Sequence, residues 1–186
     1  MKKLSLIILA ILFVLVGCSE ESSSDKQSNT EQAKPADSSK ESELSFEEKQ
    51  QEIVNFINED MNEIATYETK ANEALATVSG ENFKNDEELL TVLTNEVIPE
   101  YEKAVEKAKS LDVKVEELKP IVAQIEEATG IYHEALLLEK EALEKSDKAL
   151  IEQSNAKGDE YVQAIAAYHE EMKKLTSEYD IDYKQD

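Results

Sequence analysis

Two histidines and one cysteine are the residues of this 186-residue chain best suited to metal or nucleophilic chemistry. Each histidine, His133 and His169, is followed directly by a glutamate. A zinc-protease helix needs His-Glu-x-x-His, and a di-metal helical bundle needs a glutamate three residues before each histidine. The positions that these two motifs require hold Leu137, Lys173, Gly130 and Ala166. Neither motif is therefore present.

His133 and His169 could still form a weak divalent-cation site if two helices brought them together beside carboxylates. The alternative is that both are surface or boundary residues of acidic helices. The glycines stand at 17, 80, 130 and 158, which leaves no Gly-rich phosphate loop and no Gly-x-Ser-x-Gly nucleophile elbow. We therefore predict no catalytic residues, no cofactor and no enzymatic activity.

Cys18 is the only cysteine, so neither an intrachain disulfide nor a thiolate metal cluster can form. Two lysines, Lys2 and Lys3, begin the chain, and an apolar run from Leu4 to Val16 follows them. This run of 13 residues is shorter than the roughly 20 residues that a membrane span needs. Its length and its basic flank are typical of a secretory signal.

The apolar run ends in Leu15-Val16-Gly17-Cys18, which resembles the lipobox of bacterial lipoproteins. The resemblance implies that diacylglycerol is attached to the Cys18 thiol as a thioether, and that the chain is then cleaved between Gly17 and Cys18. It also implies a protein held at the extracytoplasmic face of the cell membrane, because two acyl chains suffice for stable anchoring. The alternatives are an ordinary secretory signal or an uncleaved anchor.

The sequence divides into three parts: a signal peptide over 1–17, a lipidated cysteine with a polar tether over 18–44, and a helical domain over 45–186. Ser, Glu, Asp, Lys and Gln dominate residues 19–44. Such a segment cannot bury enough apolar surface to offset the entropy of ordering it, so we predict a disordered spacer. Its end-to-end span would be about 30 Å by flexible-coil scaling.

The chain is strongly acidic, with 42 Asp and Glu against 20 basic residues and a formal charge of −22. Removal of residues 1–17 takes away two lysines, leaving 18 basic and 42 acidic residues and a net charge of −24. Nucleic acid is excluded as a partner, because binding it requires a basic surface. Anionic lipid headgroups would also repel the domain, and a covalent anchor would overcome that repulsion.

Apolar residues recur at helical spacing beyond residue 45, and Gly and Pro are scarce. The first stripe contains Phe46, Ile53, Ile57 and Ile64, and Gly80 is the natural end of that helix. We expect Pro99 to kink the second helix rather than divide it. The four predicted helices span about 46–79, 86–110, 115–145 and 148–179.

The loops between these helices are short, so consecutive helices should run antiparallel. We predict an all-α fold, an elongated antiparallel up-down-up-down four-helix bundle. The alternative is an extended coiled-coil hairpin that pairs with a second copy. The sequence leaves the oligomeric state open.

Signal, lipobox, polar tether and long helices together are similar in organisation to uncharacterised helical lipoproteins of Gram-positive bacteria, some of which carry a cell-wall-binding label. The resemblance implies a non-enzymatic, membrane-anchored module whose partner is another envelope protein or the cell wall. The alternative is a small-ligand-binding or divalent-metal-binding lipoprotein that is accessory to a transporter, with the ligand held between helices.

Overall fold

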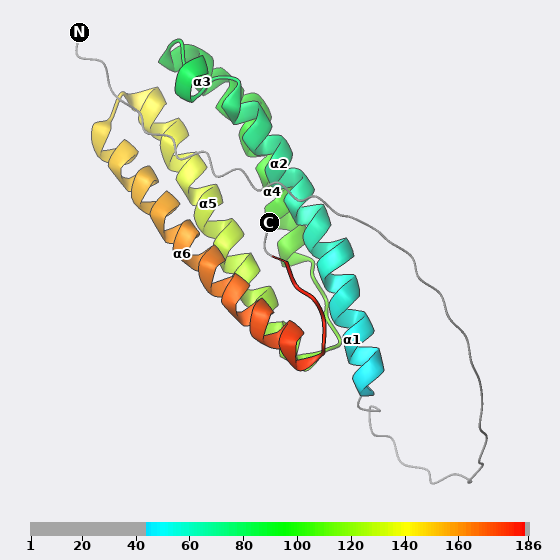
Figure 1. The fold of residues 1–186 in the computed structure, drawn as a ribbon. Helices are drawn as coiled ribbons and strands as arrows, with labels where there is room; N and C mark the ends of the chain where they lie inside the picture. The colour runs from blue at the N-terminus through cyan, green and yellow to red at the C-terminus, as the bar shows by residue number, and fades with distance from the viewer. Residues whose placement is uncertain (1–43, 185–186) are drawn as a thin grey trace, which may run out of the picture.

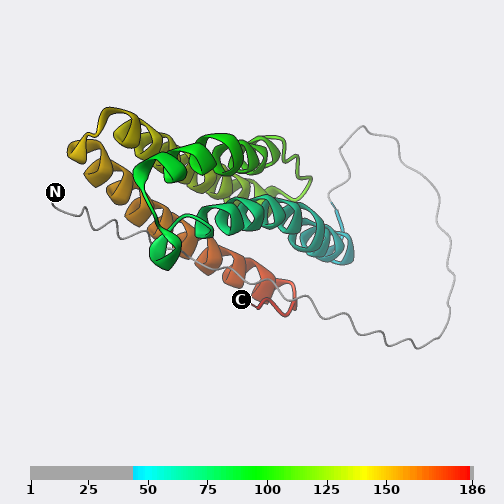
Figure 2. The same cartoon turned by 90° about the horizontal axis from the view of Figure 1, so that it is seen from above.

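The computed structural model describes residues 44–184, and every regular element in that range is helical. The elements join into four long helices, which run side by side (Figures 1 and 2). The helices of the first half are interrupted by short π segments, and two 3-10 turns lie in the connections. In chain order the elements are α1 (Phe46–Asn55), η1 (Phe56–Met61), α2 (Asn62–Ala76), η2 (Gly80–Asn82), α3 (Asp86–Val92), η3 (Leu93–Val97), α4 (Ile98–Lys109), η4 (Glu116–Leu118), α5 (Lys119–Lys145) and α6 (Lys148–Glu178).

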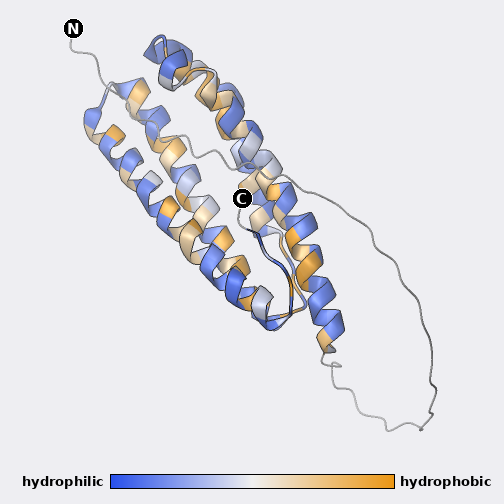
Figure 3. Cartoon of the chain, viewed as in Figure 1, coloured by the Kyte–Doolittle hydropathy of each residue, from blue (hydrophilic) through white to orange (hydrophobic). Residues whose placement is uncertain are grey.

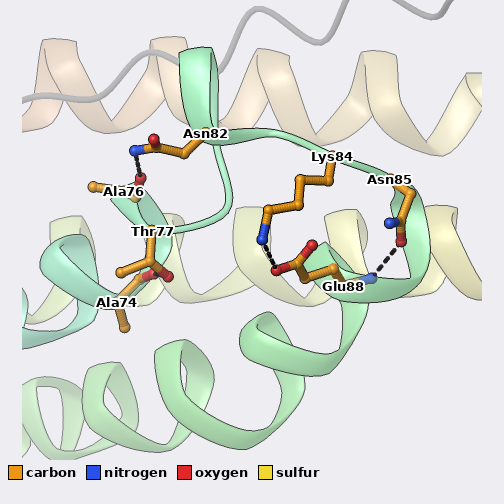
Figure 4. Close-up of polar contacts among 7 residues, drawn as sticks. All are labelled: Ala74, Ala76, Thr77, Asn82, Lys84, Asn85 and Glu88. Atoms are coloured by element: carbon orange, nitrogen blue, oxygen red, sulfur yellow. Dashed lines mark hydrogen bonds and ion pairs between the residues drawn. The ribbon is translucent and has the colours of Figure 1, made fainter.

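The first long helix consists of α1, η1 and α2, and it begins with a reciprocal cap. Ser45 Oγ accepts a hydrogen bond from the Glu48 amide, and the Glu48 carboxylate accepts one from the Ser45 amide. The helix ends at Ala76, three residues before the predicted boundary. The Asn82 side-chain amide donates to the Ala76 carbonyl and closes this end, as Figure 4 shows. Gly80 has φ +57°, but it belongs to the turn η2 and not to the helix end.

The second long helix consists of α3, η3 and α4, and it continues through Pro99. Asn85 caps its start by accepting a hydrogen bond from the Glu88 amide (Figure 4). The π turn η3 directly precedes Ile98 and Pro99, at the place where proline removes a backbone donor and crowds the carbonyl of Asn95. A widened turn accommodates both effects. The helix is therefore deformed at Pro99 and not divided.

The third and fourth long helices are α5 and α6. The third begins at Lys119, four residues later than predicted, because residues 116–118 form the 3-10 turn η4. Its last residue is followed by Ser146 in the left-handed conformation, φ 53°. Asp147 then caps α6 by accepting a hydrogen bond from the Ala149 amide.

Successive long helices are antiparallel neighbours, and together they form the predicted all-α four-helix bundle (Figure 1). All four long helices contribute residues to one apolar cluster, which favours the bundle over the extended hairpin. Apolar residues recur along each helix and alternate with hydrophilic ones (Figure 3). They form one cluster at the base, the end where α1 begins, and another toward the tip, the end with the 77–85 loop and the 146–147 turn. A third, smaller cluster of Ala128, Ile131 and Tyr161 lies between α5 and α6.

The first apolar stripe differs from its prediction at two positions. Phe46 is 47% exposed and lies at the rim of the base. Phe56 is buried, whereas Ile57 is only partly buried. Phe56 and Ile57 follow Ile53 by three and four residues, so periodicity at 3.6 residues per turn places both on the inward face and does not decide which of them is buried more deeply.

Residues 179–184, the C-terminal segment, fold back over the base. The Tyr179 ring stacks on Phe46 with centroids 5.1 Å apart, and its hydroxyl donates to Glu117 at 2.9 Å. Lys49 Nζ reaches the same Glu117 oxygen at 2.7 Å, and Gln50 Nε2 donates to the Tyr179 carbonyl at 2.6 Å. The segment thus joins α1, η4 and α6.

Candidate functional site

The residues predicted for lipidation and cleavage, Cys18 and Gly17, lie outside the described residues, as does the predicted tether up to residue 43. Both predicted histidines are described. His133 stands on α5, and His169 stands on α6.

The structure does not bring the two histidines together. The ion pair of Glu134 with Lys157, at 3.1 Å, sets the level at which α5 and α6 face each other. His133 is adjacent to Glu134 and therefore lies near the level of Lys157. His169 is twelve residues further along α6, roughly 18 Å away at 1.5 Å per residue.

Each histidine has its own polar neighbour. His133 Nε2 lies 3.6 Å from a carboxylate oxygen of Glu102 on α4. His169 Nδ1 lies 2.8 Å from the Tyr183 hydroxyl of the C-terminal segment. Burial lowers the pKa of His169, with a further contribution from the positive charge of Lys173. Within residues 44–184, no group of three or more His, Cys, Asp or Glu side chains is arranged to hold a metal ion.

A buried polar cluster, which the sequence did not reveal, adjoins the tip cluster, to which its Tyr101 belongs. Hydrogen bonds and ring contacts join Glu68, Tyr101, Tyr132 and Tyr161, which come from all four long helices. Glu139 of α5 is counted with them because its charge acts on Tyr132. The Tyr132 ring lies between those of Tyr101 and Tyr161, with centroid separations of 4.9 and 4.8 Å. These are ordinary distances for packed aromatic rings, so the rings fill this part of the core.

Glu68 of α2 directs its carboxyl group into the cluster. One oxygen accepts hydrogen bonds from the Tyr101 hydroxyl at 2.9 Å and from the Tyr161 hydroxyl at 3.4 Å. The residue is half-buried, and this burial raises the pKa of Glu68 to about 7. The two hydroxyls oppose the rise by stabilising the charged form, and burial outweighs them.

Glu139 of α5 is the more deeply enclosed of the two carboxyl groups. The residue is 8% exposed, and its Oε1 atom has no hydrogen-bond partner among the described residues. Burial alone raises the pKa of Glu139 to about 7. Its charge contributes in turn to raising the pKa of Tyr132, two turns earlier on the same helix, although burial is the larger cause there.

Both glutamates occupy inward positions of an apolar stripe, and this is the signal by which the sequence could have revealed them. In α2 the sequence alternates steps of four and three residues through Ile64, Glu68, Ala71 and Leu75. In α5 the same alternation runs through Tyr132, Leu136, Glu139 and Leu143. Such spacing places residues on one helix face. A glutamate at such a position is directed at the interior.

The chemistry that this cluster can perform is proton exchange at two carboxyl groups. Neither a thiol nor a histidine belongs to it, and its tyrosine hydroxyls are held protonated, since burial raises the pKa of Tyr101 and Tyr161 well above the ordinary value.

Comparisons of this chain with protein-family models, with curated proteins and with solved structures give no match. The helices between residues 44 and 184 include none with the length and apolar character of a membrane span.

Proposed function

We propose that the protein is a bacterial lipoprotein, anchored through Cys18 at the extracytoplasmic face of the cell membrane, whose helical bundle is a non-enzymatic interaction module of the cell envelope. The observation that carries the proposal is the placement of the sole cysteine. It stands at the last position of Leu15-Val16-Gly17-Cys18, directly after a basic start and a 13-residue apolar run. A cysteine with no intrachain partner at that point has one evident use, as the acceptor of a lipid.

The geometry of the bundle supports this arrangement. The described chain enters the bundle at its base, at Leu44 and Ser45, and the 77–85 loop lies at the opposite end (Figure 1). A lipid-anchored tether that ends at the base would attach the bundle at the end opposite the tip. The net negative charge would keep the domain from lying on anionic headgroups.

Lipidation is tested by mass spectrometry of the mature N-terminus and by incorporation of radiolabelled fatty acid in a bacterial host. We expect label on the wild-type chain and none on Cys18→Ser. The matched control is the double variant Cys18→Ser, Ser24→Cys, which restores a thiol outside the box and should also stay unlabelled. Equal labelling of Cys18→Ser, or a mature N-terminus other than residue 18, would refute the anchor.

The interaction role is tested by site-specific photo-crosslinking in intact cells. A photoreactive residue in place of Glu81, at the tip, is compared with one in place of Glu127, on the exposed side of α5. We expect a discrete crosslinked envelope component from the tip position. If neither position yields a product above that of an unrelated lipid-anchored protein, the interaction role is wrong. Thermal stabilisation by divalent cations or small metabolites would instead favour a ligand-binding lipoprotein.

A further inference from the structure

The buried polar cluster places two carboxyl groups where a well-packed bundle would ordinarily have apolar side chains. Glu68 reaches the cluster from α2 and Glu139 from α5, while Tyr101 of α4 and Tyr161 of α6 complete it. Each long helix therefore packs against a group that can gain or lose a charge.

No positive charge faces these carboxyl groups from the helices packed around them. The groups that face Glu68 are the tyrosine hydroxyls of α4 and α6, with Tyr132 of α5 beside them. Near Glu139, the Ser154 hydroxyl of α6 donates to the Ala135 carbonyl instead. The segments α3 and η3 pack on α5 through Leu89 and Leu93, and their ionisable residues are all acidic.

Several lysines of the surrounding helices pair with carboxylates elsewhere. These pairs are Lys107 with Asp60 and Glu63, Lys140 with Glu144, and Lys157 with Glu134 and Glu160. Lys70 of α2 lies over the ring of Tyr67. An ionised Glu68 or Glu139 would consequently be an uncompensated charge in the interior, which is far more costly than a protonated carboxyl group.

We propose that Glu68 and Glu139 make the bundle a proton-linked switch, which closes fully when both carboxyl groups are protonated and loosens between α2, α5 and α6 when they ionise. The feature that points to a switch is where the two groups lie. Glu68 bonds to tyrosines of two other long helices. Glu139 is buried on α5 between Leu136 and Leu143 of the tip cluster, so loss of packing at these groups affects several interfaces. A carboxyl group that served only solubility would lie on the exposed side of its helix, as Glu73 and Glu127 do.

The direction of the pH dependence follows from the pKa values. Both groups have a pKa of about 7 in the folded chain against an ordinary value of 4.5. Between these values the folded state holds protons that the unfolded state has released. Stability is therefore fully present below about pH 4.5 and is lost as the pH rises toward 7. If the chain is exposed outside the membrane, as proposed above, the pH of the medium sets the switch.

Other groups titrate in the opposite direction, so variants and not the wild-type profile alone must isolate the effect. The lowered pKa of His169 removes stability as the pH falls through its own range, below 6.5. The pKa values of Glu63 and Glu117 are lowered by hydrogen bonds from Lys107 and Lys49, and their contribution is lost only below about pH 4.5.

The experiment is urea unfolding of the full-length chain in mild detergent at about pH 5 and about pH 8. It compares the wild type with Glu68→Gln, Glu139→Gln and the double variant. Glutamine keeps an acceptor for the tyrosine hydroxyls and cannot ionise. For a pKa raised from 4.5 to about 7, the wild-type folding equilibrium constant should fall by on the order of 50-fold per carboxyl group over this interval.

In the double variant, most of this pH-dependent decrease in the folding equilibrium constant should disappear. Glu73→Gln and Glu127→Gln should show the same decrease as the wild type. An unchanged pH dependence in the double variant would overturn the proposal. If that variant does not fold, infrared spectroscopy of the wild type decides the question. We expect the band of a protonated carboxyl group at about pH 6, where exposed glutamates are ionised, and its loss by about pH 8. Absence of the band at pH 6 would equally overturn the proposal.

Discussion

Tyr179 should be the residue by which the C-terminal segment stabilises the base of the bundle. It is buried, its ring stacks on Phe46 at 5.1 Å, and its hydroxyl donates to Glu117 at 2.9 Å. Two substitutions separate these contributions. Tyr179→Phe keeps the ring and removes the hydroxyl, whereas Tyr179→Ala removes both.

The expected magnitudes follow from the contacts. A hydrogen bond to a charged group contributes about 1.5–3 kcal/mol when buried. Glu117 is 36% exposed and keeps its ion pair with Lys49, so we expect Tyr179→Phe to cost only about 1 kcal/mol. Tyr179→Ala also loses the buried ring and its stacking, and large-to-small aromatic substitutions cost about 3–5 kcal/mol. The rim position favours the lower figure, about 3 kcal/mol.

The assay is urea unfolding followed by far-UV circular dichroism near neutral pH, with the free energy of unfolding compared at constant slope. The control is Tyr67→Phe, because the Tyr67 hydroxyl donates to Glu63 on the same long helix and joins no second element. We expect that control to stay within about 0.5 kcal/mol of the wild type. If Tyr179→Ala did so too, the segment would not be holding α1 to α6, and the reasoning would fail.

Three further substitutions test other parts of the structure by the same unfolding measurement. Ser146→Gly should stabilise the chain by about 0.5–1 kcal/mol, because Ser146 follows α5 with φ 53°, a conformation that glycine adopts without strain; a loss of stability would contradict this. Met172→Ala should cost about 2–5 kcal/mol, since Met172 is fully buried in the base cluster, and a cost under 1 kcal/mol would show that the site is not enclosed. Ser45→Ala should cost about 1 kcal/mol through loss of the cap on α1, and no change would indicate that this end is frayed.

The four long helices could be predicted from the sequence because their signals are local. The predicted starts at 46, 86 and 148 are confirmed, and Ser45, Asn85 and Asp147 cap these three helices. The difference at Phe56 and Ile57 has another cause. Both residues fall on the inward face after Ile53, and packing by the other helices decides that Phe56 is buried and Ile57 only partly so.

Pro99 shows that the sequence can predict where a helix is distorted but not what geometry the distortion takes. A proline inside a helix removes a hydrogen bond and crowds the preceding turn, so a distortion was predicted there. The sequence does not specify how the chain relieves that crowding. The structure places the π turn η3 just before Ile98 and Pro99, so one wide turn replaces a break.

The buried polar cluster is the part of the candidate site that sequence reasoning missed, and the acidity of the chain explains why. Among 42 acidic residues, a glutamate on an apolar stripe does not stand out. Whether such a position is enclosed depends on how the other helices cover it, which is tertiary information. Tyr101 and Tyr161, from two other helices, surround the carboxyl group of Glu68.

The chain has 42 acidic residues, so solubility does not require that two glutamates lie in the interior. At neutral pH, each enclosed glutamate costs stability that a leucine at the same position would supply. Glu139 retains an oxygen without a partner among the described residues, whereas Thr129, the other buried polar residue of α5, donates its hydroxyl to the Ile125 carbonyl. A polar residue at an inward helix position, where an apolar side chain would give more stability, is expected to have a functional role. The proton-linked proposal therefore attaches to Glu68 and Glu139 and not to the many carboxylates that solvent already surrounds.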